Sequence, residues 1–269
     1  MKRDQRKIEK MAPWMFCSLA LFVAPVTSLF VKSTAGIKRN ALVRSSVAGS
    51  PSKFVPPIPE TGDKTTLDLA NEFLHTGSGF YSSPRPEMLS EQFVFRGPVV
   101  GPLNKKDYLE TMETFKIYEA FPDISPNAWG FSVDPVNDRK VWFLVRNTGT
   151  NTGSLGLGFG ITAPPSGNKV DGAPETFSIL FDDDQRVKQL TVGYVADRFE
   201  GNTGGVGAAL GLIRVANIPI PGATSPVFRA LGWFSNKVLN NPAKTASREE
   251  DVPKWWLDLG RTERGADGA

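Results

Sequence analysis

The order of its secondary-structure patterns constrains this chain most, because helix patterns come first and strand patterns follow. Thr65 to Asp68 has the spacing of a capping box, and the helix that it begins should end near Gly77. Further helices are expected over residues 86–90 and after a cap at Asn104. Apolar residues alternate in strand fashion over residues 129–133, 176–181 and 187–196. Two continuous apolar runs, over residues 93–96 and 141–147, are also expected to be strands. Helices followed by consecutive strands predict an α+β fold with an antiparallel sheet.

Two connections between the strand patterns have a distinct character. Asp182 to Gln185 should form the hairpin turn between the last two strands. The connection from Thr148 to Glu175 is long, and loops of that length are usually functional or mobile. Its glycines should give it flexibility; they are Gly156, Gly158 and Gly160. No Gly-Lys-Ser/Thr ending follows them, so a nucleotide-binding loop is not indicated.

The first 54 residues have the composition of targeting sequence. A basic start precedes an apolar run from Met11 to Val26, which predicts a signal peptide over residues 1–28. A transit peptide and linker are expected over residues 29–60, whose first part is basic and serine-rich. This arrangement resembles the bipartite leader of algae with secondary plastids, and it implies a plastid location. Secretion with a basic linker is the alternative.

Removing the leader reverses the charge of the chain. The whole sequence carries a formal charge of +3, but residues 55–269 contain 21 basic and 26 acidic residues, a charge of −5. The mature chain therefore has no overall basic balance for nucleic acid. Cys17 lies in the leader and His75 is the single histidine. Disulfides, thiolate nucleophiles and a metal site built from Cys or several His are excluded for the mature chain.

A sequence motif lies within the long connection. Gly149-Thr150-Asn151-Thr152-Gly153 is followed by Pro164-Pro165-Ser166-Gly167-Asn168-Lys169. The pair resembles a signature of the SnoaL-like polyketide-cyclase family, which reads Gly-Thr-His-Thr-Gly and then Pro-Pro-Thr-Gly-Lys. The resemblance implies a cone-shaped fold like that of nuclear transport factor 2 (NTF2) over residues 61–200. In that fold a curved antiparallel sheet wraps around N-terminal helices and encloses a central pocket.

The same resemblance makes Asp197 the catalytic candidate. It follows the last strand, where the family carries an acid-base aspartate in a similar Asp-Arg context. A carboxylate beside an apolar pocket can have a raised pKa and can move a proton at a carbon next to a carbonyl. The alternative is that Asp197 pairs with Arg198 or another basic residue, or caps the next turn.

Four further residues are candidates for ligand binding. Asn151 replaces the family histidine, so it can hydrogen-bond to a ligand but cannot carry a proton; the alternative is that it binds loop backbone. Arg146 could hold a ligand's carboxylate or enolate, or pair with an internal acid. Trp142 and Tyr194 would line the pocket, although strand aromatics usually pack in cores. His75 suits the C-terminal end of the first helix.

A C-terminal amphipathic extension is expected over residues 201–269. Its helical stripe consists of Val227, Leu231, Phe234 and Val238, and the pair Trp255-Trp256 lies in its tail. The extension could contact a membrane surface or a partner, or it could dock on its own domain.

Two functions follow. The first is a cofactor-free, metal-free cyclase or isomerase of a hydrophobic carbonyl compound, with Asp197 as acid and base and Asn151 or Arg146 stabilising the oxyanion. The second is a non-catalytic protein that binds a small molecule or assists assembly at the thylakoid. Neither needs nucleic acid, and a homodimer is compatible with both.

Overall fold

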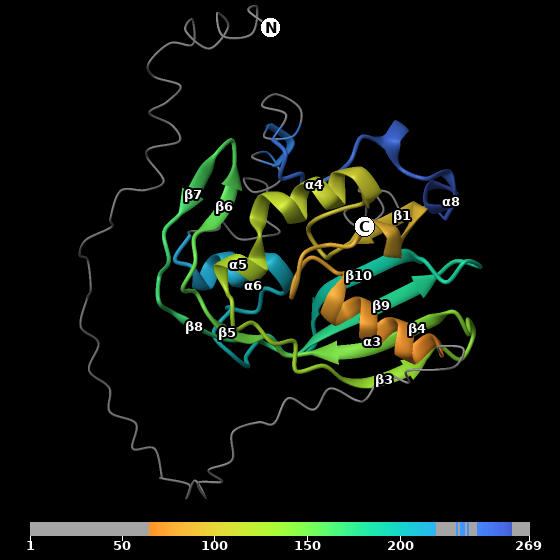
Figure 1. Ribbon diagram of the computed structural model, residues 1–269, viewed down its shortest axis with the longest axis horizontal. Helices are drawn as coiled ribbons and strands as arrows, with labels where there is room; N and C mark the ends of the chain where they lie inside the picture. The colour runs from red at the N-terminus through yellow and green to blue at the C-terminus, as the bar shows by residue number, and fades with distance from the viewer. Residues whose placement is uncertain (1–64, 219–229, 231, 235, 237–240, 260–269) are drawn as a thin grey trace, which may run out of the picture. The chain divides into compact units, whose positions relative to one another are not determined.

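The structure, a computed structural model, describes residues 65–218, 230, 232–234, 236 and 241–259 (Figure 1). The expected signal and transit peptides lie outside these residues, as do Val227, Leu231 and Val238. Ile58–Ala269 forms one compact unit.

The helices begin where the capping signals predict them. α3 (Thr66–Thr76) starts after Thr65, which forms the predicted capping box with Asp68. α4 (Lys105–Phe115) starts after Asn104, whose side chain accepts a hydrogen bond from the Asp107 backbone amide. The other helical elements are η1 (Pro86–Met88), α5 (Ile117–Ala120), α6 (Ala208–Val215), η2 (Glu249–Asp251) and α8 (Lys254–Leu257).

Six strands form the main sheet, in the order β2-β1-β10-β9-β4-β3. They are β1 (Leu89–Arg96), β2 (Leu103–Asn104), β3 (Trp129–Val133), β4 (Lys140–Val145), β9 (Glu175–Phe181) and β10 (Val187–Val195). The predicted turn at Asp182 to Gln185 joins β9 to β10. Every neighbouring pair is antiparallel except β1 and β10, which run parallel. A long stretch of chain separates these two strands, so no hairpin turn fixes their relative direction.

Register shifts interrupt β1, β3 and β10. An extra residue bends a strand and increases its twist, and the sheet curves accordingly (Figure 1). The predicted α+β class, with helices against a curved and mainly antiparallel sheet, is confirmed.

The long connection between β4 and β9 forms two small sheets. Its strands are β5 (Thr148–Thr150), β6 (Leu155–Gly158), β7 (Ile161–Ala163) and β8 (Lys169–Asp171). β5 pairs with β8, and β6 pairs with β7. The expected flexible role of Gly156 is wrong, because a Cβ there would lie 1.9 Å from the Thr114 carbonyl oxygen of α4. This glycine allows close backbone packing instead.

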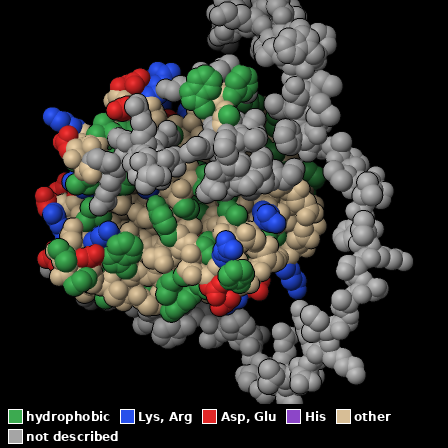
Figure 2. Space-filling model, turned by 180° about the vertical axis from the view of Figure 1, so that it is seen from behind, with side chains coloured by type: hydrophobic (Ala, Val, Ile, Leu, Met, Phe, Trp, Pro, Cys, Tyr) green, Lys and Arg blue, Asp and Glu red, His purple; other side chains and the backbone are tan. Residues whose placement is uncertain are grey.

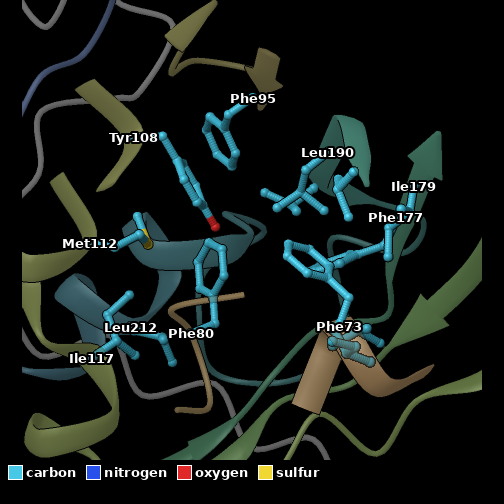
Figure 3. Close-up of a cluster of buried hydrophobic side chains, with 14 of the residues drawn as sticks. Phe73, Phe80, Phe95, Tyr108, Met112, Ile117, Phe177, Ile179, Leu190 and Leu212 are labelled. Carbon is cyan, nitrogen blue, oxygen red and sulfur yellow. The ribbon is translucent and has the colours of Figure 1, made fainter. Parts of the chain in front are cut away.

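Helices and strands meet in one buried cluster on the inner face of the sheet (Figure 3). Phe73 comes from α3, Tyr108 from α4, Phe177 from β9 and Leu212 from α6, and each is at most 2 % exposed. The Tyr108 hydroxyl donates to the Ser78 carbonyl. Large side chains therefore occupy much of the inner face, where the resemblance implies a pocket.

The described part of the chain beyond residue 200 packs against the elements that precede it. α6 contributes to the main cluster, and Trp256 of α8 is 2 % exposed and packs against Val94 of β1. The Ser247 hydroxyl donates to the Asp107 carboxylate at 2.5 Å. The alternative of docking on its own domain is confirmed for the Trp255-Trp256 pair. Within the described residues, no helix is long and apolar enough to cross a bilayer.

Candidate functional site

Asp197 lies at the surface beyond the end of β10. Its side chain is exposed, and its carboxylate accepts the Phe199 backbone amide at 2.9 Å. The expectation of an inward-facing carboxylate at this position is wrong, because β10 ends at Val195 and the chain turns outward. The capping alternative is confirmed, and the position does not support a catalytic role.

Asn151 is fully buried and binds backbone with every polar atom of its side chain. Its amide donates to the Ala120 carbonyl at 3.0 Å and to the Gly153 carbonyl at 3.1 Å. Its oxygen accepts the Ser166 amide at 2.8 Å. An asparagine amide has two hydrogens, so none remains for a ligand. The role in oxyanion stabilisation is therefore wrong, and the backbone-binding alternative is confirmed.

Arg146 is at the surface and pairs with two carboxylates. Its guanidinium lies 3.2 Å from Asp171 and 2.7 Å from Glu200, and its side chain is 37 % exposed. Arg146 pairs with acids, as the alternative predicts, but both acids lie at the surface and not in the interior. These pairs occupy the guanidinium that a ligand carboxylate would need.

Trp142 and Tyr194 lie on the outer face of the sheet. Trp142 is opposite Ser178, and Tyr194 is opposite Thr176. These partners alternate with Phe177, which points into the core, so both aromatic rings point away from it. The Trp142 indole donates to Asp134 at 2.6 Å, and Tyr194 is 42 % exposed. Their expected place in an inner pocket is wrong.

His75 lies in the last turn of α3, as predicted. Its Nδ1 lies 2.9 Å from the Asn71 carbonyl oxygen of the same helix. Its structural interpretation is confirmed.

The inner face instead has a carboxyl group at Glu175, the first residue of β9. Glu175 is 1 % exposed and lies opposite Val145 of β4 and Val195 of β10. Its carboxylate accepts the Ala208 backbone amide, at the start of α6, at 2.8 Å. A buried strand and a helix N-terminus therefore position this group.

Asn147 and Tyr81 extend the polar group around Glu175. The Asn147 side chain is 4 % exposed and hydrogen-bonds to the Glu175 carboxylate. Tyr81 is a half-buried residue, and its hydroxyl donates to the Asn147 oxygen at 2.7 Å. The three side chains form a chain of hydrogen bonds from the Tyr81 phenol to a buried carboxyl, which we call the Glu175 network.

Burial determines the electrostatics of the Glu175 network. Removal from water raises the pKa of Glu175 from 4.5 to about 7, although the hydrogen bonds from Ala208 and Asn147 oppose the shift. Burial, with a further contribution from the Glu175 charge, raises the pKa of Tyr81 well above its usual 10. Near neutral pH the carboxyl can therefore gain or lose a proton while the phenol stays neutral.

The sequence contained a signal for Glu175. The alternation over residues 176–181 directs Phe177 and Ile179 inward, and one more step back along the strand reaches Glu175 with the same orientation. β9 begins at Glu175, one residue before the predicted start of the strand. Nothing in the local sequence indicates the partners Asn147 and Tyr81, because they are distant along the chain.

No metal site is evident in the described parts of the chain. No group of three His, Cys, Asp or Glu side chains there is placed to hold a metal ion. On the face seen in Figure 2, basic and acidic side chains lie interspersed, with hydrophobic side chains between them.

Comparison with known proteins gives remote structural similarities. No protein-family description matches the sequence, and no curated protein matches it. The chain is similar to a putative SnoaL-like polyketide cyclase from Jannaschia sp. CCS1 (15 % identity, TM-score 0.39), covering 58 % of this chain and 93 % of that one. It is also similar to a putative polyketide cyclase from Acidithiobacillus ferrooxidans (15 % identity, TM-score 0.35), covering 59 % of this chain and 100 % of that one. A third similarity is to a steroid delta-isomerase from Pseudomonas aeruginosa (17 % identity, TM-score 0.23), covering 40 % of this chain and 62 % of that one.

Proposed function

We propose that this chain is a small-molecule pocket protein of the SnoaL-like kind, which performs cofactor-free proton transfer on a hydrophobic carbonyl compound. Glu175, rather than Asp197, is the acid and base of this proposal. The carrying observation is a buried carboxyl with a pKa of about 7, at the edge of an aromatic cluster and connected to the Tyr81 phenol. The signature around Asn151 and the α+β fold support the assignment to this kind of protein.

The chemistry uses the two protonation states of Glu175. The carboxylate takes a proton from a carbon next to the ligand carbonyl, and the bonding electron pair moves to the carbonyl oxygen as an enolate. The enolate then follows one of two routes. Attack of its carbon on a second carbonyl gives cyclisation, and protonation of a conjugated enolate at a different carbon gives isomerisation. The Glu175 carboxylic acid returns the proton. Asn147 holds the carboxyl in place, and Tyr81 remains a neutral hydrogen-bond donor.

The test uses a probe that needs only a base. The ring of 5-nitrobenzisoxazole opens when a carbon-bound proton is removed, and the product absorbs visible light. We expect turnover by the wild-type chain to rise with pH through about 7, since the carboxylate is the active form. Glu175→Gln should lower it at least tenfold.

Asp197→Asn is the matched control, because it removes a surface carboxylate of similar chemistry. It should leave the rate unchanged. Equal rates for wild type and Glu175→Gln would remove Glu175 from the mechanism, and a loss confined to Asp197→Asn would restore the original assignment.

A non-catalytic binding or assembly role is the second candidate. It is favoured because the Asn151 amide and the Asp197 carboxylate both bind backbone, and because Glu175 caps the start of α6. Mass spectrometry of copurifying small molecules separates the two candidates. A binding protein should retain the same unconverted molecule in the wild type and in Glu175→Gln.

Action in a plastid remains part of the proposal. Its support is the composition of residues 1–54. A fusion of these residues to a fluorescent reporter should place the signal in the plastid, and a reporter that is secreted would contradict this location.

A further inference from the structure

The hairpin formed by β6 and β7 ends in an apolar tip. We call residues 155–163 the arm; Figure 1 shows its two strands running together to a tip away from the main sheet. At the tip, Phe159 is 52 % exposed and Ile161 is 47 % exposed. The turn between the strands consists of Phe159 and Gly160, with φ values of 54° and 75°.

This turn presents an aromatic ring at a conformational cost. Two-residue turns with positive φ at both positions favour Asn-Gly and Asp-Gly. A bulky side chain in that region is uncommon, and strained backbone is concentrated at functional positions. Phe159 is 52 % exposed, so burial offsets only part of the strain.

The arm and the sequence on either side of it carry no charge. From Asn147 to Asn168 the sequence contains no Asp, Glu, Lys, Arg or His. A charged side chain is costly to move into a bilayer, whereas aromatic and aliphatic side chains enter its interface readily. Protein-binding surfaces usually have an apolar centre and a polar, charged rim. The arm itself has no charged residue that could form such a rim.

The base of the arm is rigid. Leu155 is 1 % exposed, and Gly153 lies so close to α5 that a Cβ would be 2.0 Å from the Glu119 carbonyl oxygen. The two strands of the arm also pair with each other as an antiparallel ladder. The tip is thus held out from a fixed support.

Another exposed apolar pair lies in a neighbouring segment. Trp233 is 62 % exposed and Phe234 is 38 % exposed. Gly232, beside this pair, lies against Thr245. The segment that contains Thr245 also contacts the arm, because a Cβ added to Gly158 would lie 2.1 Å from the Asn241 side chain. Aromatic residues, Trp above all, are enriched at membrane interfaces.

We propose that the tip of the arm inserts into the interfacial layer of a lipid bilayer, with Phe159 and Ile161 as the inserted side chains. Because the arm carries no basic residue, the apolar contact drives the association. Binding is therefore expected to neutral lipid and to change little with salt.

The experiment reads the tip itself, because the apolar run of the leader could bind vesicles on its own. In the full chain, Cys17→Ser removes the native thiol and Thr162→Cys provides a site at the tip for the environment-sensitive dye NBD. With phosphatidylcholine vesicles, we expect a blue shift and at least a threefold increase in NBD emission. Phe159→Asn in the same chain should weaken the apparent partition constant at least tenfold.

Phe159→Asn also separates binding from folding. Asparagine suits the turn better than phenylalanine, so the melting temperature should stay the same or rise while binding is lost. Phe199→Asn is the matched control; Phe199 is 85 % exposed in another loop, and its loss should leave the partition constant unchanged. NBD at Asp183→Cys, in the exposed β9–β10 turn, should show no change in emission.

Three results would overturn the proposal. They are unchanged NBD emission at position 162 with vesicles, a Phe159→Asn chain that binds as the parent does, and an emission change that depends on protein concentration without lipid. The last result would assign the tip to contact between copies of the chain.

Discussion

At the scale of single residues, two of the predicted site residues hold backbone, and a buried carboxyl lies elsewhere, at Glu175. Asn151 and Asp197 both bind main-chain groups, and neither faces an open interior. Glu175 also caps a helix, but its burial brings its pKa to about 7. A carboxyl that titrates near neutral pH is a candidate for proton transfer wherever it meets a ligand.

The raised pKa of Glu175 predicts a specific pH dependence of stability. Folding favours the protonated form, so this contribution is complete below pH 4.5 and is lost as the pH rises through about 7. The shift corresponds to about 3 kcal/mol in the free energy of unfolding. Glu175→Gln should match the wild type near pH 4 and exceed it above pH 7. Urea unfolding of both chains from pH 4 to pH 8 measures the difference; a constant difference would contradict the burial argument.

The hydrogen bonds of Asn151 predict a large effect of a small change. Asn151→Asp keeps the size of the side chain but places a carboxylate against the carbonyls of Ala120 and Gly153. Unsatisfied buried polar groups cost about 1–3 kcal/mol each, so the free energy of unfolding should fall by about 3 kcal/mol. In the control Asn137→Asp, the side-chain oxygen accepts one backbone amide, which a carboxylate can also do. Equal stability of the two variants in urea would refute the assignment.

At the scale of elements, the connection between β4 and β9 is a packed structure. Gly153 and Gly156 bring the backbone of the arm against α5 and α4 at distances that no side chain permits. Leu155 between them is buried. The glycines therefore allow close backbone packing at the base of the arm. In the turn at its end, glycine allows a positive φ.

The close packing of the arm predicts the effect of one methyl group. Gly156→Ala places a Cβ 1.9 Å from the Thr114 carbonyl oxygen, so the arm must move away from α4. Overpacking typically costs about 1–3 kcal/mol, and a clash with backbone should be at the upper end. Ser154→Ala, at an exposed position of the same segment, should change the free energy of unfolding by less than about 0.5 kcal/mol. Hydrogen exchange in residues 155–163 should rise in Gly156→Ala alone; protection equal to wild type would contradict the packing.

At the scale of the whole molecule, α6 and the segment around α8 pack against the elements that precede them. α6 shares the main cluster with α3 and α4, and Trp256 covers Val94 of the sheet. The C-terminal segment also exchanges hydrogen bonds with the start of α4 through Ser247.

This packing predicts a single unfolding transition. Far-ultraviolet circular dichroism and tryptophan fluorescence should give coincident urea curves. Trp256→Ala should lower the free energy of unfolding by about 3–5 kcal/mol, whereas Trp233→Ala, at an exposed position, should cost less than about 1 kcal/mol. A separate early transition for the C-terminal segment would show that it unfolds independently.

The sequence by itself determined the local structure. Thr65 and Asn104 cap their helices as predicted, and the alternation over residues 129–133, 176–181 and 187–196 marks three strands of the sheet. These features depend on hydrogen bonds and side-chain periods within a few residues, which are visible in the sequence. The order of helices and strands likewise predicted the α+β class.

Only the tertiary structure decided which polar groups face the interior. Asp197 lies at the surface because β10 ends before it, and Asn151 binds backbone that comes from α5 and from the segment after β7. The Glu175 network joins three segments that are far apart in sequence. Burial and long-range contact set the pKa of a carboxyl, and both arise only when distant parts of the chain pack together.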